Sequence, residues 1–189
     1  MENKANRFLV GFYDVVEVAI TALVIATLLY VAGFRQAQVV GDSMQNTLQS
    51  GQRLLLNNFF YEPSRGDIVV INRYHAEKTY SALDLELGRD EPLIKRVIAV
   101  GGDTVQVESD AVYVNGKRLD EPYVYSSQNM LQPNDPYGMT VEVPEGYLFV
   151  MGDHRDESLD SRWSEVGLIK TSDVMGKAIW RLTPFGSIE

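Results

Sequence analysis

The sequence predicts a mostly β domain that follows one N-terminal transmembrane helix. A run of 17 residues without a charge, from Val18 to Phe34, lies near the N-terminus. Short apolar segments of strand length then recur between turn-forming residues over the rest of the 189-residue chain. No internal repeat or low-complexity tract interrupts them. Many short strands of this kind favour a folded, barrel-like sheet over a helical bundle.

The apolar run is expected to be a retained membrane anchor. A helix over residues 18–34 spans about 25 Å, a little short of the ~30 Å hydrocarbon core, and apolar residues upstream could extend it. A cleaved signal peptide is the first alternative, but no Ala-x-Ala site stands near the end of the run. A buried core helix is the second, and the run has no polar face. The predicted division is therefore a short tail over 1–17, an anchor over 18–34 and a further domain over 35–189.

Charge does not decide how the anchor is oriented. Lys4 and Arg7 precede the apolar run, and Arg35 and Arg53 follow it within about 20 residues. The comparison of flanking positive charges is close to a tie, and only the short tail favours an N-terminus on the inside.

The expected strands follow in order after Arg35. Most are continuous apolar runs, and the one over 104–108 alternates with period two. Asn115-Gly116 is the strongest short signal for a hairpin. Residues 121–144, rich in Pro, Tyr, Asn and Ser, predict irregular surface. The predicted strands are 38–40, 53–56, 67–72, 93–100, 104–108, 111–114, 146–151 and 174–182.

Composition excludes several classes of protein. A net charge of −9 argues against a nucleic-acid partner. The absence of cysteine removes disulfides, thiolate nucleophiles and Cys-ligated zinc. His75 and His154 leave little room for a His-based metal site or a Ser-His-Asp triad. We therefore expect no metal and no cofactor.

Three polar features stand out against this background. Ser43, in the segment Gly41–Leu48, is a candidate nucleophile, although serine is common in ordinary loops. Lys95 and Arg96 fall within the apolar run 93–100, where alternation sends one inward and leaves the other to solvent. A buried lysine has a lowered pKa and can act as a general base. It could equally snorkel to the surface or pair with a carboxylate.

The third feature is the segment 151–162, which follows a predicted buried strand. It holds four acidic residues, two arginines and two serines. It is either a solvated acidic loop or a hydrogen-bonded platform at a strand end. In the second interpretation Ser158 bonds a catalytic side chain, and Asp160 pairs with Arg162. His154 is a weak alternative base, because the sequence offers it no orienting partner.

Four separated stretches, in this order, resemble the type I signal peptidases, which are membrane-anchored serine proteases with a Ser-Lys dyad. Any one of them would be a weak match, and together with the apolar run they are a specific one. They are Gly41-Asp-Ser-Met44, Arg65-Gly-Asp-Ile-Val-Val70, Ile94-Lys-Arg96 with Gly101-Gly-Asp103, and Gly152-Asp-x-Arg-x-x-Ser-x-Asp-Ser-Arg162.

The resemblance implies roles for individual residues. Ser43 would be the nucleophile and Lys95 the general base, while Ser158 would hydrogen-bond the lysine. Asp160 and Arg162 would form a supporting pair. Shallow apolar pockets for small substrate side chains would be lined by Val39, Met44, Leu48 and Ile94.

The resemblance also implies the activity. The enzyme would remove signal peptides from exported precursor proteins after small residues in an Ala-x-Ala-like pattern. Its mostly β catalytic domain would lie on the extracytoplasmic side of the cell membrane, held by a single span. An extended substrate could add as a strand beside residues 38–42.

The chain departs from the family pattern at three positions. Asn46 stands where proline is usual, which puts the rigidity of the turn after Ser43 in question. Gly41 lacks the hydroxyl that some relatives use as a second oxyanion donor, and His154 replaces a commoner asparagine. The chain also lacks the large inserted domain of some Gram-negative members.

Two other classes of protein remain as alternatives. One is the self-cleaving repressors, soluble Ser-Lys peptidases with a DNA-binding domain; the apolar run, the acidic charge and the missing helix-turn-helix region argue against it. The other is a catalytically weak or specialised relative that assists pilus or surface-protein assembly. Ser43 and Lys95 argue against that class, and Asn46 keeps it open.

Overall fold

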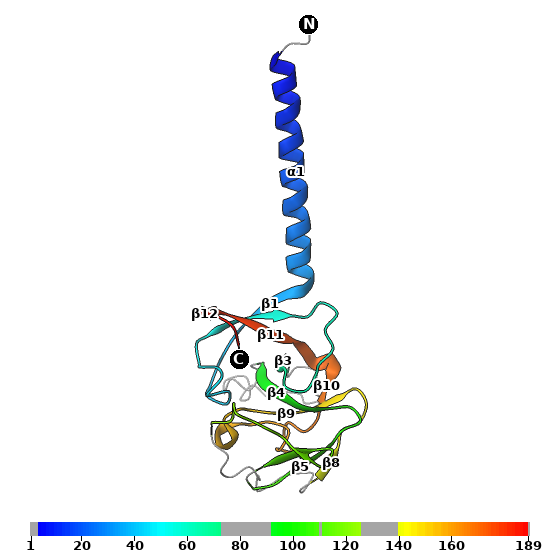
Figure 1. Cartoon of the computed structure of the whole chain (residues 1–189), viewed down its shortest axis with the longest axis vertical. Coiled ribbons are helices and arrows are strands. Elements are labelled where there is room, and N and C mark those ends of the chain that lie inside the picture. Colours follow the sequence, from blue (N-terminus) through cyan, green and yellow to red (C-terminus); the bar gives the residue numbers. More distant parts are fainter. Residues whose placement is uncertain (1–3, 73–91, 110, 126–139, 189) are drawn as a thin grey trace, which may run out of the picture.

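The computed structural model describes residues 4–72, 92–109, 111–125 and 140–188. One long helix leads into a domain built from two antiparallel sheets (Figure 1). The expected mostly β domain with one N-terminal helix is confirmed.

The helix α1 runs from Lys4 to Gly33 and projects away from the β domain as a rod (Figure 1). Its 30 residues span about 45 Å. The part long and apolar enough to cross a membrane, by length and composition, is Val10–Leu28, and none of it is buried against the rest of the chain. A buried core helix is therefore excluded. The helix starts well before the predicted span of 18–34 and ends one residue earlier, because Phe34 already belongs to a strand.

The larger sheet has eight strands; the predicted base Lys95 lies on one of them, and the predicted nucleophile Ser43 lies in the connection between two others. Neighbouring strands are antiparallel in the order β1-β2-β11-β3-β4-β9-β10, and β12 pairs with β11. The bounds are β1 Phe34–Gln38, β2 Arg53–Asn57, β3 Ile68–Ile71, β4 Leu93–Val100, β9 Tyr147–Met151, β10 Ile169–Lys170, β11 Val174–Thr183 and β12 Phe185–Gly186.

The smaller sheet is formed by four strands in the order β7-β6-β5-β8. The predicted hairpin connects β6 to β7, and Asn115 and Gly116 take φ values of 54° and 74°. Two consecutive positive φ values are what a type I′ turn requires, so the Asn-Gly signal is confirmed. The bounds are β5 Thr104–Val107, β6 Val112–Val114, β7 Lys117–Arg118 and β8 Thr140–Glu142.

Several strands differ from the prediction. The strand predicted at 38–40 lies at 34–38, directly after the helix, and the two-residue strands β7, β10 and β12 gave no apolar run to detect. β8 falls inside the segment 121–144 that was predicted to be irregular, and residues 126–139 of that segment lie outside the described residues. Two short 3₁₀ helices, η2 Arg155–Glu157 and η3 Thr171–Asp173, complete the described elements.

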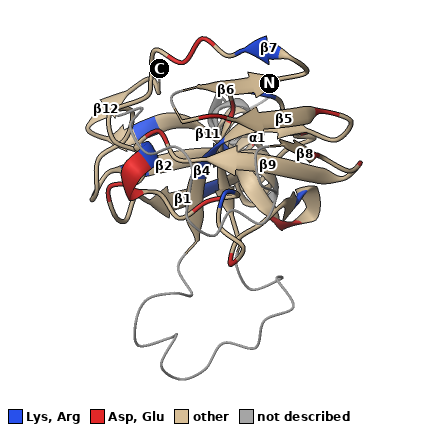
Figure 2. Cartoon of the chain, turned by 90° about the horizontal axis from the view of Figure 1, so that it is seen from below, with Lys and Arg blue, Asp and Glu red and all other residues tan. Residues whose placement is uncertain are grey.

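Strand β4 lies at the centre of the packing. It supplies Ile98 and Ala99 to the core shared with the smaller sheet, Ile94 to a second apolar cluster and Val97 to a third. Charged segments lie mostly on loops and rims, whereas basic residues also appear inside the domain near β4 (Figure 2). Because both faces of β4 are covered, a lysine in this strand is buried whichever face its side chain points to.

Candidate active site

Ser43 lies in a compact turn that begins where β1 ends. The N–H of Val39 still bonds to the carbonyl of Gln52 at 2.8 Å, which continues the pairing with β2. The chain then reverses, with N–H groups of Gln45 and Leu48 bonding to the carbonyls of Asp42 and Met44. The buried side chains of Met44 and Leu48 fix the turn to the core.

Lys95 meets this turn from β4. Its residue is only 2% exposed, and its Nζ lies 2.6 Å from Ser43 Oγ, within hydrogen-bond distance. Burial of an amine disfavours its charged form, and a neutral amine can accept a proton. The two residues come from segments 52 positions apart in sequence. The arrangement is that of a nucleophile with an adjacent base.

Segment 152–162 forms a buried polar platform behind the pair. Ser158 Oγ donates a hydrogen bond to Asp160 Oδ2 at 2.6 Å, and the N–H of Gly152 donates to both of these oxygens. Arg162 donates to Asp160 through Nε and Nη2, each at 2.8 Å. Burial raises the pKa of the Asp160 carboxyl, but its bonds to Arg162, Ser158 and the Gly152 N–H outweigh burial and lower that pKa.

Gly152 brings this platform against the nucleophile turn. A Cβ atom at this position would overlap with both Ser158 Oγ and the carbonyl oxygen of Ser43. In addition, the N–H of His154 donates to that same carbonyl at 3.0 Å. The structure therefore places Ser158, Asp160 and Arg162 beside the turn that carries Ser43, and only a glycine fits between them.

Arg96 does not face solvent, as simple alternation along the strand predicted. It is 8% exposed, and it bonds to Asp153 through Nε and Nη2 at 2.8 and 2.6 Å. Its guanidinium lies 3.8 Å from the ring centroid of Tyr123. The reason is that packed residues cover both faces of β4, so the second cation is also buried and is paired within the protein.

The four predicted pocket residues come together in one apolar cluster. They pack with Leu54, Leu56, Ile68, Val70 and Ala178 and expose at most 7% of their surface. That they line pockets for a substrate stays a prediction. The residues are Val39, Met44, Leu48 and Ile94.

His154 is not organised as a base within the described residues. Its ring contacts Tyr125 edge to face, with centroids 4.8 Å apart, and its Nδ1 has no hydrogen-bond partner there. No carboxylate therefore orients the ring in the described part of the chain, as a Ser-His-Asp triad requires. His75 lies outside the described residues. Among those that are described, no three acidic or histidine side chains gather into a possible metal site.

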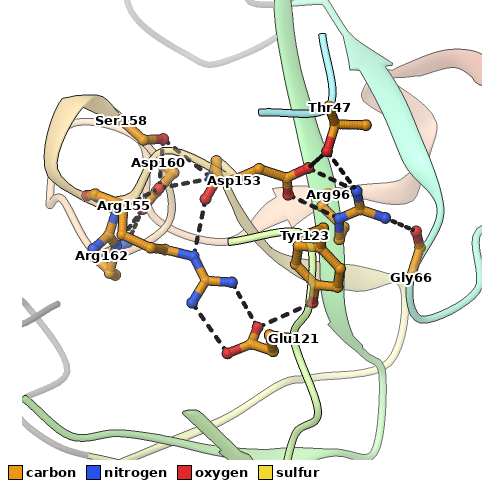
Figure 3. A network of polar contacts seen from close by, with 11 residues as sticks. Thr47, Gly66, Arg96, Glu121, Tyr123, Asp153, Arg155, Ser158, Asp160 and Arg162 are labelled. Atoms are coloured by element: carbon orange, nitrogen blue, oxygen red, sulfur yellow. Dashed lines mark hydrogen bonds and ion pairs between the residues drawn. The ribbon is translucent and has the colours of Figure 1, made fainter. Parts of the chain in front are cut away.

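Residues that no sequence pattern indicated join the platform to the turn. Thr47 donates from Oγ1 to Asp153 Oδ2 at 2.5 Å, and Arg96 bonds to the same carboxylate (Figure 3). Glu121 and Tyr123, from a segment predicted to be irregular surface, bond to each other at 3.0 Å beside Arg96. The segment Glu121-Pro-Tyr123 has the composition of an ordinary surface loop, so nothing in the sequence pointed to this role.

The chain matches a known protein family over most of its length. The model of the family described as "Signal peptidase, peptidase S26" matches residues 12–183. The chain belongs to this family. The match extends from within the helix to the end of β11, so it covers the nucleophile turn, β4 and the segment 152–162.

Curated members of the peptidase S26 family are similar to the chain over most of its length. "Signal peptidase I" of Bacillus licheniformis is 34% identical over 195 residues, covering 99% of this chain and 97% of the relative. "Signal peptidase I S" of Bacillus subtilis (strain 168) is 34% identical and covers 89% and 88%. A signal peptidase I crystal structure from Enterococcus faecalis V583 is 29% identical, covers 63% of this chain and 98% of that one, and has a TM-score of 0.44.

Proposed function

We propose that this chain is a serine endopeptidase that removes signal peptides from exported precursor proteins, with Ser43 as nucleophile and Lys95 as general base. Membership of the peptidase S26 family and the similarity to curated signal peptidases I support the activity. The roles of the two residues rest on one observation, the 2.6 Å approach of Nζ of the buried Lys95 to Ser43 Oγ.

The chemistry follows from this pair. Ser43 Oγ attacks the scissile carbonyl carbon while its proton passes to the neutral Lys95 amine. The C–N bond then breaks, and Lys95 returns the proton to the leaving amine, which leaves the signal peptide as an ester on Ser43. Lys95 next takes a proton from water, and the resulting hydroxide attacks the ester carbonyl carbon. The bond from this carbon to Ser43 Oγ then breaks, and Ser43 Oγ takes the proton from Lys95, which releases the signal peptide.

The negative charge that forms on the carbonyl oxygen of the tetrahedral intermediate is stabilised by a hydrogen-bond donor. The N–H of Ser43 is the proposed donor, and the adjoining turn offers no side-chain hydroxyl at Gly41. Ser158 is proposed to hydrogen-bond the lysine, held in turn by Asp160 and Arg162. These three form the buried platform next to the Ser43 carbonyl.

The substrate is proposed to bind as an added strand. In the described part of the chain β1 is the last strand of its sheet, so one edge lies open next to residues 38–42. An extended peptide can pair with such an edge through its backbone. The pocket residues Val39, Met44, Leu48 and Ile94 pack into one buried apolar cluster, and on this proposal they line the shallow pockets that take small side chains.

The anchor and its orientation are also part of the proposal. Helix α1 would hold the chain in the cell membrane through its central apolar stretch, with residues 1–17 as tail and first turns and 35–189 as the catalytic domain. The catalytic domain would lie on the extracytoplasmic side, where precursors emerge. Protease protection in sealed inverted membrane vesicles tests this: the domain should be protected from added protease, and digestion would reverse the assignment.

Cleavage of a precursor is the direct test. The full chain in detergent should cut a precursor with an Ala-x-Ala site, and Ser43→Ala and Lys95→Ala should each abolish cutting while the protein stays folded. Ser50→Ala and Lys170→Ala, at exposed positions, are matched controls that should keep full activity. Normal processing by either site variant would refute the mechanism. A folded wild-type chain that cuts no precursor would instead favour the assembly role.

A further inference from the structure

Three ion pairs are buried between β4 and the segment 152–162 (Figure 3). Every one of their six side chains is at most 10% exposed, and four of them are fully buried. We call this group the six-charge cluster. Its pairs are Arg96–Asp153, Arg155–Glu121 and Arg162–Asp160.

Neutral contacts connect the three pairs into one unit. Tyr123 lies against the Arg96 guanidinium with its ring and donates from its hydroxyl to Glu121 Oε1 at 3.0 Å, which joins the first pair to the second. Arg162 Nη2 donates to the backbone carbonyl of Arg155 at 2.8 Å, which joins the second pair to the third. Glu121 and Tyr123 belong to no motif that suggested the family.

The cluster is also linked to the two segments that carry the Ser-Lys pair. Arg96 is the residue next to Lys95 in β4, and Asp153 accepts a bond from Thr47, which lies four residues after Ser43. Arg155 Nε donates to the carbonyl of Gly152 at 2.9 Å, the glycine that abuts Ser43.

The charges of the six-charge cluster sum to zero. Three guanidinium groups stand against three carboxylates, so the cluster as a whole adds no net charge near the lysine. In a buried site, a single uncompensated charge about 10 Å away would shift a pKa by roughly one unit. A net negative cluster would hold Lys95 as an ammonium ion, which cannot accept the proton of Ser43.

We propose that the neutral six-charge cluster keeps Lys95 deprotonated at working pH, and that Glu121 and Arg155 are positioning residues that act on Lys95 through their charge. This inference rests on the proposed function of Lys95. Within the cluster, burial lowers the pKa of Arg96, and Asp153, Tyr123 and Glu121 together outweigh burial and raise that pKa.

Other titratable groups lie in or next to the segments around the Ser-Lys pair and must stay unchanged in a test. The nucleophile turn contributes Asp42, and the segment 152–162 contributes His154. Two further ion pairs among the described residues lie in or next to the strands β3, β5 and β11. They are Asp67 with Lys177 and Asp103 with Arg65.

The test removes one charge of each sign. Glu121→Gln leaves a net positive cluster, so the pH at which Lys95 titrates should fall by several tenths of a unit or more. Arg155→Gln leaves a net negative cluster, so the pH at which Lys95 titrates should rise by a similar amount. The double variant is neutral again and should return close to wild type. The rising limb of the pH–rate profile and the ¹³Cε resonance of Lys95, assigned by its loss in Lys95→Ala, both report this titration.

Asp120→Asn is the matched control, because it removes a carboxylate one residue from Glu121 but at an exposed position. Asp120→Asn should leave the pH at which Lys95 titrates unchanged. Equal shifts in Asp120→Asn and Glu121→Gln, or no shift in Glu121→Gln, would overturn the proposal. Glu121→Gln keeps an acceptor oxygen for Arg155, so this variant is expected to fold. If Arg155→Gln does not fold, the result for Glu121→Gln decides the question by itself. The resonance is measured without substrate, so failure to cut a precursor would count against the proposed function only.

Discussion

The carbonyl oxygen of Ser43 accepts a hydrogen bond from the N–H of His154 at 3.0 Å. The bond joins the turn that carries the nucleophile to the start of the buried platform, and it uses backbone atoms only. Gly152 lies beside it, so any side chain there would separate the two segments.

Gly152→Ala should therefore abolish cleavage and lower the free energy of unfolding by several kcal/mol, because the added carbon overlaps with Ser43 and Ser158. Thermal unfolding and precursor cleavage measure the two effects. Gly51→Ala is the control: its φ is 88° but no atom lies within 4 Å of the new carbon, so only backbone strain of about 1 kcal/mol is expected. Full activity in Gly152→Ala would show that the two segments need not touch.

Ser158→Ala should lower the rate constant of cleavage by about tenfold or more, because Asp160 and the Gly152 N–H lose a buried partner and Lys95 loses its proposed brace. Ser161→Ala is a matched control, since its buried Oγ accepts from the N–H of Val150 and does not take part in the bonds among Gly152, Ser158 and Asp160. It should cost similar stability with little change in rate. If both variants slow cleavage equally, Ser158 has no special part in the site.

Arg96→Lys should lose both stability, by about 2–4 kcal/mol, and most activity, although the charge is kept. A lysine cannot bond to Asp153 with two parallel N–H groups or stack on Tyr123 in the same way. Urea unfolding and cleavage of a precursor measure the losses. Arg118→Lys, at an exposed position in β7, should change neither quantity, and a silent Arg96→Lys would contradict the importance of the paired geometry.

Asp103 should make stability depend on pH in the acid range. Burial raises the pKa of its carboxyl, but bonds from Arg65, from the Val100 N–H and from Asn115 outweigh burial and lower that pKa. The carboxyl therefore stabilises the fold above its unfolded pKa of about 3.9, and this stabilisation disappears as the pH falls through the lower folded value.

The difference in unfolding free energy between wild type and Asp103→Asn should accordingly be largest above about pH 5 and shrink below pH 4. Denaturant titrations at several pH values measure it. The size is modest because Arg65 is about half exposed and its pairing is screened by solvent. A difference that stays constant down to pH 2 would mean that Asp103 titrates alike in both states.

Sequence patterns predicted the strands better than the surroundings of their polar residues. The eight residues of β4 were predicted with correct bounds, because an apolar run ended by Gly-Gly-Asp leaves little ambiguity. The burial of Arg96 was not predicted, because period-two alternation assumes one solvated face and β4 has none. The partnership of Lys95 with Ser43 depended on the resemblance to a family, since no local pattern connects residues 52 positions apart.

The platform was foreseen only in part. Ser158, Asp160 and Arg162 lie within one short segment, so their grouping could be predicted from spacing alone. Glu121 and Tyr123 reach the site from a segment more than 25 residues before it. Contacts at that separation depend on how the two sheets pack together, which residue patterns do not encode locally.

Helix α1 passes into β1 without a spacer. Gly33 ends the helix and Phe34 begins the strand, and the carbonyl of Gly33 accepts a bond from the N–H of Asn58 at 3.0 Å. Ser43 lies ten positions after Gly33, so the nucleophile is at most about 35 Å from the end of the helix. With the helix spanning a membrane, the hydroxyl works at a set height above the lipid. Such an enzyme selects a peptide bond by its distance from the bilayer as well as by the residues around it.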